Sequence, residues 1–158
     1  MRIEGTDPQT GETITAEAPG LTSSILSAIA DLDVSDDRIR EIIDQLNVSA
    51  DAKSALYLVS KVVVKVGQTV VRIGRKIMDI IVALFEEFPN AGFGAIFGAI
   101  IGFLLSTIPV IGQLLGPIVT PVLISFGLVI GAKHDIQNSD LARKIAKANQ
   151  QFSSFRAE

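Results

Sequence analysis

The most constraining feature of this sequence is a run of 45 consecutive residues, Phe88 to Ala132, without a charged side chain. Pro109 and Gly112 divide the run into two arms of about 19 residues, each roughly 28 Å long as a helix and close to the thickness of a bilayer's hydrocarbon core. Core helices of soluble proteins usually keep one polar face. The run therefore predicts a transmembrane or re-entrant helical hairpin over residues 89–132, in preference to a buried hairpin of a soluble helical protein.

Glycine recurs at four-residue spacing in both arms, at Gly94, Gly98 and Gly102 and again at Gly127 and Gly131. Residues four apart lie on one face of a helix, and a face without side chains lets another backbone approach closely. In lipid, such faces supply the packing contact between helices. We expect these glycines to pack one arm against the other or one subunit against the next, and we therefore expect a homo-oligomer.

Charge is distributed unevenly around the hairpin. Residues 1–51 contain 11 acidic and 3 basic side chains and carry −8, whereas residues 52–87 carry +3 and residues 133–158 carry +2. Basic segments thus flank a hairpin with an uncharged tip, and the positive-inside rule places both termini on the cytoplasmic side of a membrane. No signal peptide is recognisable at the start of the sequence. No basic stretch is interleaved with aromatic residues, so nucleic acid is not an expected partner.

The remaining segments predict helices. Residues 1–20 are expected to be a flexible acidic arm, although the alternation at 12–16 is compatible with a strand. Residues 21–48 predict two short amphipathic helices, capped by Thr22 or Ser23 and by Ser35. Residues 49–88 show heptad spacing and predict one long basic helix with Ser49 as its cap. Residues 133–158 predict a basic C-terminal helix. The sequence thus predicts an all-α membrane protein, with the long amphipathic helix followed by the glycine-rich hairpin.

The long predicted helix gathers five cations opposite its apolar seam: Lys61, Lys65, Arg72, Arg75 and Lys76. A solvated helix face is the ordinary explanation. Alternatively, the row binds anionic lipid headgroups, an interaction worth about 1 kcal/mol per basic residue near a membrane surface. The acidic segment 1–51 is a second expected contact for these cations, and it is also a possible docking site for another protein.

No pattern in the sequence argues for an enzyme, a cofactor or a metal site. The glycines between 92 and 98 have the wrong spacing for a dinucleotide-binding loop, His134 is the only histidine and cysteine is absent. Two functions remain open. One is an oligomerising, membrane-inserting protein that forms pores or permeabilises membranes, of the toxin, effector or phage lysis or entry type. The other is a non-lytic structural membrane protein, a scaffold or virion component that coats or shapes a bilayer. In general architecture alone, the first resembles the pore-forming bacteriocins.

Overall fold

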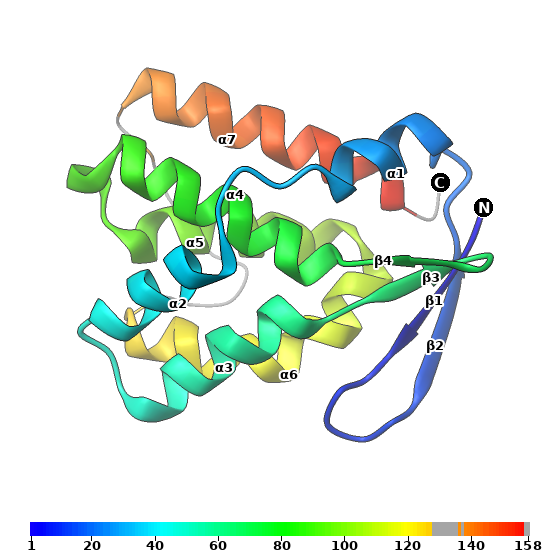
Figure 1. The fold of residues 1–158 in the computed structure, drawn as a ribbon, viewed down its shortest axis with the longest axis horizontal. Coiled ribbons are helices and arrows are strands. Elements are labelled where there is room, and N and C mark those ends of the chain that lie inside the picture. The colour runs from blue at the N-terminus through cyan, green and yellow to red at the C-terminus, as the bar shows by residue number, and fades with distance from the viewer. Residues whose placement is uncertain (128–135, 137, 157–158) are drawn as a thin grey trace.

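The computed structural model describes residues 1–127, 136 and 138–156. Within these residues the chain forms seven α-helices and one four-stranded antiparallel sheet (Figure 1). The strands are β1 (Arg2–Thr6), β2 (Thr13–Glu17), β3 (Val64–Val66) and β4 (Thr69–Val71). The helices are α1 (Ser23–Ala30), α2 (Asp36–Gln45), α3 (Ala50–Lys61), α4 (Ile73–Glu87), α5 (Phe93–Thr107), α6 (Pro109–Ser125) and α7 (Ser139–Phe152). Two short 3-10 turns, η1 (Pro89–Ala91) and η2 (Ser153–Phe155), follow α4 and α7.

The sheet has the strand order β2-β1-β3-β4, so the two N-terminal strands pair with a hairpin from the middle of the chain. The ammonium group of Met1 donates a hydrogen bond to the carbonyl oxygen of Ala18 at 3.0 Å, and the Ala18 N–H donates one back at 2.8 Å. Ile3, in β1, is completely buried. Residues 2–6 and 13–17 of the acidic N-terminal segment therefore belong to the folded sheet.

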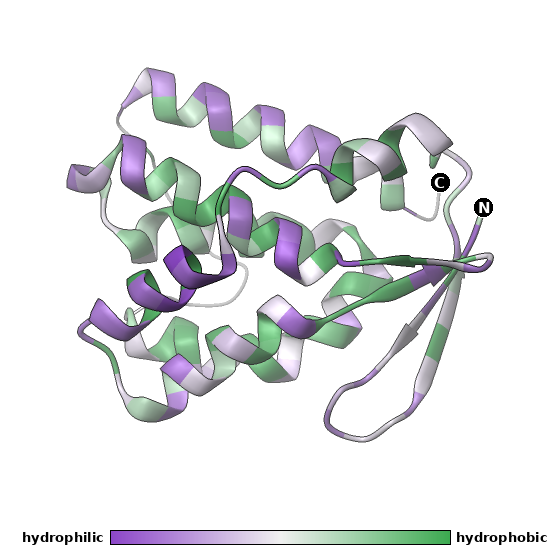
Figure 2. Ribbon diagram, viewed as in Figure 1, coloured by the Kyte–Doolittle hydropathy of each residue, from purple (hydrophilic) through white to green (hydrophobic). Residues whose placement is uncertain are grey.

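Helix α4 lies at the centre of the helical body and contacts α1, α2, α3, α5 and α7. Helices α5 and α6 pack against each other; α6 also contacts α3 and the first two strands, and α7 covers α5. Figure 2 shows the resulting contrast between the mainly hydrophilic α2 and α7 and the mainly hydrophobic α6. The two most apolar helices are therefore enclosed on several sides by amphipathic ones.

A single long helix over residues 49–88 is wrong. Helix α3 ends at Lys61, α4 begins at Ile73, and the β3–β4 hairpin lies between them. Residues 64–66 bury two valines and expose Lys65, which is the two-residue alternation of a strand and not the spacing of a helix. Gly67 has a φ of 63°, which suits the first central position of a type II′ hairpin turn. Clustered β-branched residues and this turn outweigh the heptad pattern.

The all-α membrane fold, with its transmembrane, pore-forming hairpin, is also wrong. Among the described residues no helix has both the length and the apolar character needed to cross a bilayer; α5 has 15 residues and α6 has 17. Their large apolar side chains, such as Phe97, Ile100 and Val119, are completely buried within the protein. The uncharged run is thus a major part of the protein's own core. Residues 128–132 of the run lie outside the described residues.

Gly74 in the first turn of α4 allows that helix to touch α3. Its N–H donates a hydrogen bond to the carbonyl oxygen of Val62 at 3.0 Å. A Cβ atom at this position would lie 1.8 Å from the carbonyl oxygen of Val59, which belongs to the backbone of α3 and cannot rotate away. Gly102 in α5 is the opposite case, because a Cβ there would meet no described atom within 4 Å.

We therefore expect Gly74→Ala and Gly102→Ala to change stability in opposite directions. Overpacking of α3 against α4 should lower the free energy of unfolding of Gly74→Ala by about 2 kcal/mol or more. Gly102→Ala should raise it by roughly 0.5–1 kcal/mol, because alanine is the better helix former. Urea unfolding followed by circular dichroism measures both. Equal stability of Gly74→Ala and the unmodified chain would contradict the close contact between the two helices.

Candidate functional site

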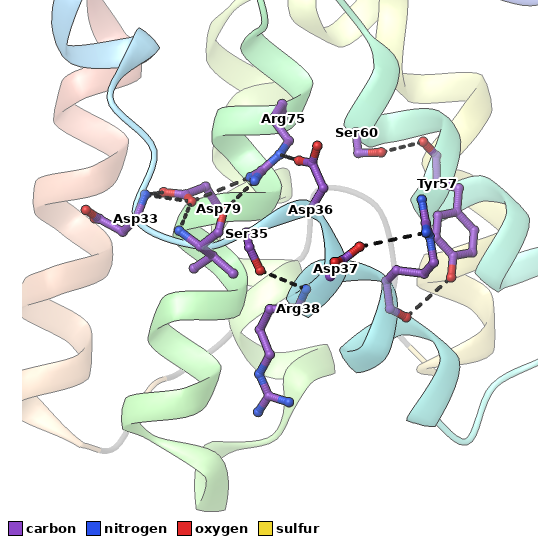
Figure 3. A network of polar contacts seen from close by, with 11 residues as sticks. Asp33, Ser35, Asp36, Asp37, Arg38, Tyr57, Ser60, Arg75 and Asp79 are labelled. Atoms are coloured by element: carbon purple, nitrogen blue, oxygen red, sulfur yellow. Dashed lines mark hydrogen bonds and ion pairs between the residues drawn. The ribbon is translucent and has the colours of Figure 1, made fainter.

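Asp79 in α4 is a buried carboxylate that binds the segment between α1 and α2 (Figure 3). Its side chain is 1% exposed. Oδ1 accepts hydrogen bonds from the backbone N–H groups of Asp33 at 3.0 Å and Val34 at 2.7 Å. A carboxylate removed from water needs such charge-assisted hydrogen bonds. Without them, it would be an unpaired buried ion, whose desolvation is unfavourable by several kcal/mol. Asp79 thereby holds residues 33–34 against the central helix.

Arg75 and Lys76, one turn before Asp79, complete this polar network. Their side chains are 5% and 8% exposed. Arg75 donates a hydrogen bond to Asp36 at 2.6 Å and places Nη1 3.5 Å from the Asp79 carboxylate. Lys76 donates to the carbonyl oxygen of Asp31 at 2.5 Å. The hydrogen bond and the charge of Arg75 hold the pKa of Asp36 below its usual range. The network therefore clamps residues 31–36 onto α4.

Tyr57 in α3 forms a second tie to α2. Its hydroxyl group donates a hydrogen bond to the Asp44 carboxylate at 2.5 Å. Burial raises the pKa of Tyr57 to about 12, and the hydrogen bond to Asp44 acts in the same direction because it favours the protonated phenol. Helix α2 is thus fixed to α4 at its beginning and to α3 at its end.

The five cations that the sequence places in one row lie on different elements. Lys61 ends α3, Lys65 is in β3 and Arg72 precedes α4, and all three are exposed. Arg75 and Lys76 are buried in the network of Asp79. Three of these cations meet the acidic segment 1–51 among the described residues: Arg75 pairs with Asp36, Lys76 donates to the carbonyl oxygen of Asp31, and Lys65 lies opposite Glu4 in the β1–β3 register.

The role of Asp79 is missing from the sequence prediction, although a signal for it exists. Arg75, Lys76 and Asp79 have i,i+3 and i,i+4 spacing on a helix that is otherwise apolar almost all round, from Ile73 to Leu84. Charged residues embedded in such a helix are rarely buried unless they are paired. This spacing indicates a buried ionic network once residues 73–87 are recognised as a separate helix.

We expect Asp79→Asn to destabilise the fold strongly, because it removes the carboxylate that pairs with the buried Lys76 and one of the two that pair with the buried Arg75. The expected loss in free energy of unfolding is about 3 kcal/mol or more. Asp37→Asn is the matched control, since the Asp37 side chain is 97% exposed and its substitution should change stability by less than about 0.5 kcal/mol. Both values come from urea unfolding. If the two variants were equally stable, the network would not hold the fold together.

A second feature is the outward side of α6, which is uncharged. We call this surface the α6 face; it consists of the exposed residues Pro109, Gln113, Pro117, Pro121, Ile124 and Ser125. Ile124 is 69% exposed, which is the largest exposed fraction of any large hydrophobic residue among the described residues. The exposed side of a helix in water normally carries charged or strongly polar residues. The α6 face is therefore a candidate binding surface.

Hydroxyl groups near this face are bonded within their own helices. Thr120 donates to the carbonyl oxygen of Gly116 at 2.9 Å, Ser106 to that of Gly102 at 2.9 Å, and Thr107 to that of Phe103 at 2.6 Å. A hydroxyl that already has a partner loses less when water is removed from it. These three hydroxyl groups consequently add little to the desolvation penalty when an apolar partner covers the α5–α6 pair.

The glycines that the sequence assigns to helix packing have different surroundings. A Cβ at Gly94 would lie 2.8 Å from the ring of Phe126, so this glycine accommodates the residue that ends α6. Gly98 is buried in α5, whereas Gly102 faces open space among the described residues. Gly127 follows α6 with a φ of 71°. Gly131 lies outside the described residues.

Comparison of the chain with protein-family models, with curated proteins and with solved structures found no match. Within residues 1–127, 136 and 138–156, no group of three or more His, Asp or Glu side chains could hold a metal ion. The exposed surfaces of the fold and the network around Asp79 are therefore the features that bear on function.

Proposed function

We propose that this chain is a non-catalytic structural protein that binds the surface of a lipid bilayer through the α6 face. The observation that carries this proposal is the absence of charge from the entire exposed side of a 17-residue helix, together with the exposure of Ile124. Such a helix can lie in the plane of the interface with its outward residues among the headgroups and the upper acyl chains. In this arrangement the protein stays folded and coats the bilayer without crossing it.

Energetic considerations support binding from the surface. Full burial of an isoleucine side chain is worth roughly 1.5–3 kcal/mol, and no charged group of the α6 face has to be desolvated. The three prolines of the face add apolar area and have no N–H group to desolvate. Binding of this kind scales with buried apolar area and is reversible. The exposed cations Lys61, Lys65 and Arg72 lie on other elements, so the proposal does not require anionic lipid.

A second candidate is self-association through the same face. Gly116 lies between the exposed prolines, and a Cβ at this position would meet no described atom within 4 Å. An uncharged surface bordered by a glycine is suited to close approach of a second helix. The same face on a second copy would give a symmetric dimer, in which each α6 packs against the other.

The test compares the unmodified chain with Gln113→Glu/Ile124→Glu, which adds two charges to the α6 face without replacing a buried residue. Flotation with vesicles of phosphatidylcholine alone isolates the apolar contribution from headgroup charge. We expect the variant to bind at least about tenfold more weakly, which corresponds to 1.4 kcal/mol. The matched control is Ala146→Glu/Gln150→Glu, which adds the same charge to exposed positions of α7 and should bind like the unmodified chain.

Light scattering and dye retention distinguish the alternatives in the same samples. Flotation of the unmodified chain with dye retained in the vesicles supports a coating role, whereas release of the dye assigns a permeabilising activity and contradicts it. A dimer in buffer that the Gln113→Glu/Ile124→Glu variant dissociates, without flotation, assigns the face to a second copy. A monomer that does not float overturns both candidates.

A further inference from the structure

The outer edge of the sheet at β4 forms a groove with α1, which we call the β4 groove. Residues 69–72 line one side, and Leu26, Ile29, Ala30 and Leu32 line the other. We propose that the β4 groove binds an extended acidic segment of a partner protein. The segment adds to β4 as a fifth strand, inserts one aliphatic side chain into the groove and places its acidic side chains near Lys65 and Arg72. This site is separate from the α6 face.

The hydrogen-bond pattern of the sheet shows that β4 has an open edge. Val66 and Thr69 flank the two-residue turn, so they form a hydrogen-bonded pair, and the next such pair is Val64 and Val71. Between them, Val70 lies opposite Lys65 in a non-hydrogen-bonded pair, so its N–H and C=O groups point away from β3. Within the described residues, neither the N–H group nor the C=O group of Val70 has a hydrogen-bond partner. An added strand can satisfy both groups.

Strand β4 exposes Thr69 and Val70 and contains no charged residue, which distinguishes it from the other edge strand of the sheet. The Val70 side chain is 54% exposed and Val63, just before β3, is 37% exposed. Protein edges that avoid pairing usually carry charged residues or proline. The opposite edge strand, β2, exposes Thr13, Thr15 and Glu17 instead. Of the two edges, β4 is therefore the one suited to strand addition.

The cavity next to β4 defines the kind of side chain that the site accepts. Its volume is about 110 Å³ and its lining is mainly aliphatic. An apolar cavity of roughly 150 Å³ holds benzene, whereas pockets for drug-sized ligands measure roughly 300–1,000 Å³. The β4 groove consequently fits one aliphatic side chain of a peptide. Main-chain bonds along an edge together with a pocket for one side chain are the usual features of peptide recognition by strand addition.

The surrounding charges favour an acidic segment. Lys65 and Arg72 are exposed on either side of Val70, and neither forms an ion pair within 4.0 Å among the described residues. On the sheet side of the groove, Glu4 is opposite Lys65, and the pKa of Asp36 is lowered chiefly by Arg75 and to a smaller extent by Arg72. On the α1 side, the exposed Asp31 and Asp33 adjoin the lining residue Leu32. Glu4 pairs with Arg2 and Asp36 with Arg75. The unpaired charge on the sheet side of the groove is therefore positive, and acidic side chains of a bound segment are expected to face this side.

The test uses a synthetic seven-residue peptide in which glutamate and isoleucine alternate, labelled for fluorescence anisotropy. We expect saturable binding to the full chain. Binding should weaken at least tenfold when alternate peptide nitrogens are methylated, because these nitrogens supply the strand hydrogen bonds. It should weaken similarly in Val70→Pro, which removes the outward N–H without breaking a bond to β3. Thr15→Pro, placed on the opposite edge of the sheet, is the matched control and should bind normally.

Two further variants test the cavity and the charges. Ala30→Phe fills the groove from its exposed α1 side and should abolish binding. Arg72→Glu should weaken binding of the glutamate–isoleucine peptide and strengthen binding of a lysine–isoleucine peptide. Thermal unfolding confirms that each variant is folded. No binding by the unmodified chain, equal binding of the methylated peptide, or equal losses in Thr15→Pro and Val70→Pro would overturn the proposal. A dimer that Val70→Pro dissociates, without peptide binding, would assign the edge to a second copy.

Discussion

The burial of the Asp79 carboxylate is the constraint on which the arrangement of the N-terminal half depends. A carboxylate that is 1% exposed requires donors, and the backbone N–H groups of Asp33 and Val34 supply them. Residues 31–36 must therefore cross α4 at this point. That crossing places α1 beside β4 and begins α2 where it can pack on α3 and α4. The cavity of the β4 groove is thus a consequence of the same interaction.

The centre of the protein explains why 45 consecutive residues lack charge without forming a membrane hairpin. Helices α5 and α6 are covered by α3, α4, α7 and the sheet, so their large side chains have little contact with water. Among the described residues the α6 face remains exposed, and it carries no charge because none of its side chains ionises. The proposed docking surface is consequently a side of the apolar pair that the described residues leave uncovered.

Local signals in the sequence were sufficient for the starts of α1, α2 and α3 but not for the fold. Thr22, Ser35 and Ser49 cap helices as their chemistry predicts, because capping depends on a few neighbouring residues. The heptad pattern over 49–88 failed, because valine satisfies an apolar seam in a helix and the inner face of a strand equally well. The pairing of β3 with β1 and the contact of Asp79 with Asp33 join residues more than 40 positions apart, and no local pattern contains that information.

Hydrogen exchange of the backbone amides in plain aqueous buffer, without lipid or detergent, tests the central claim that the uncharged run is the protein's own core. We predict that the amides of α5 and α6 exchange as slowly as those of α4, because all three helices open only when the whole protein unfolds. Rapid exchange of α5 and α6 in buffer, with protection appearing only after lipid or detergent is added, would contradict it.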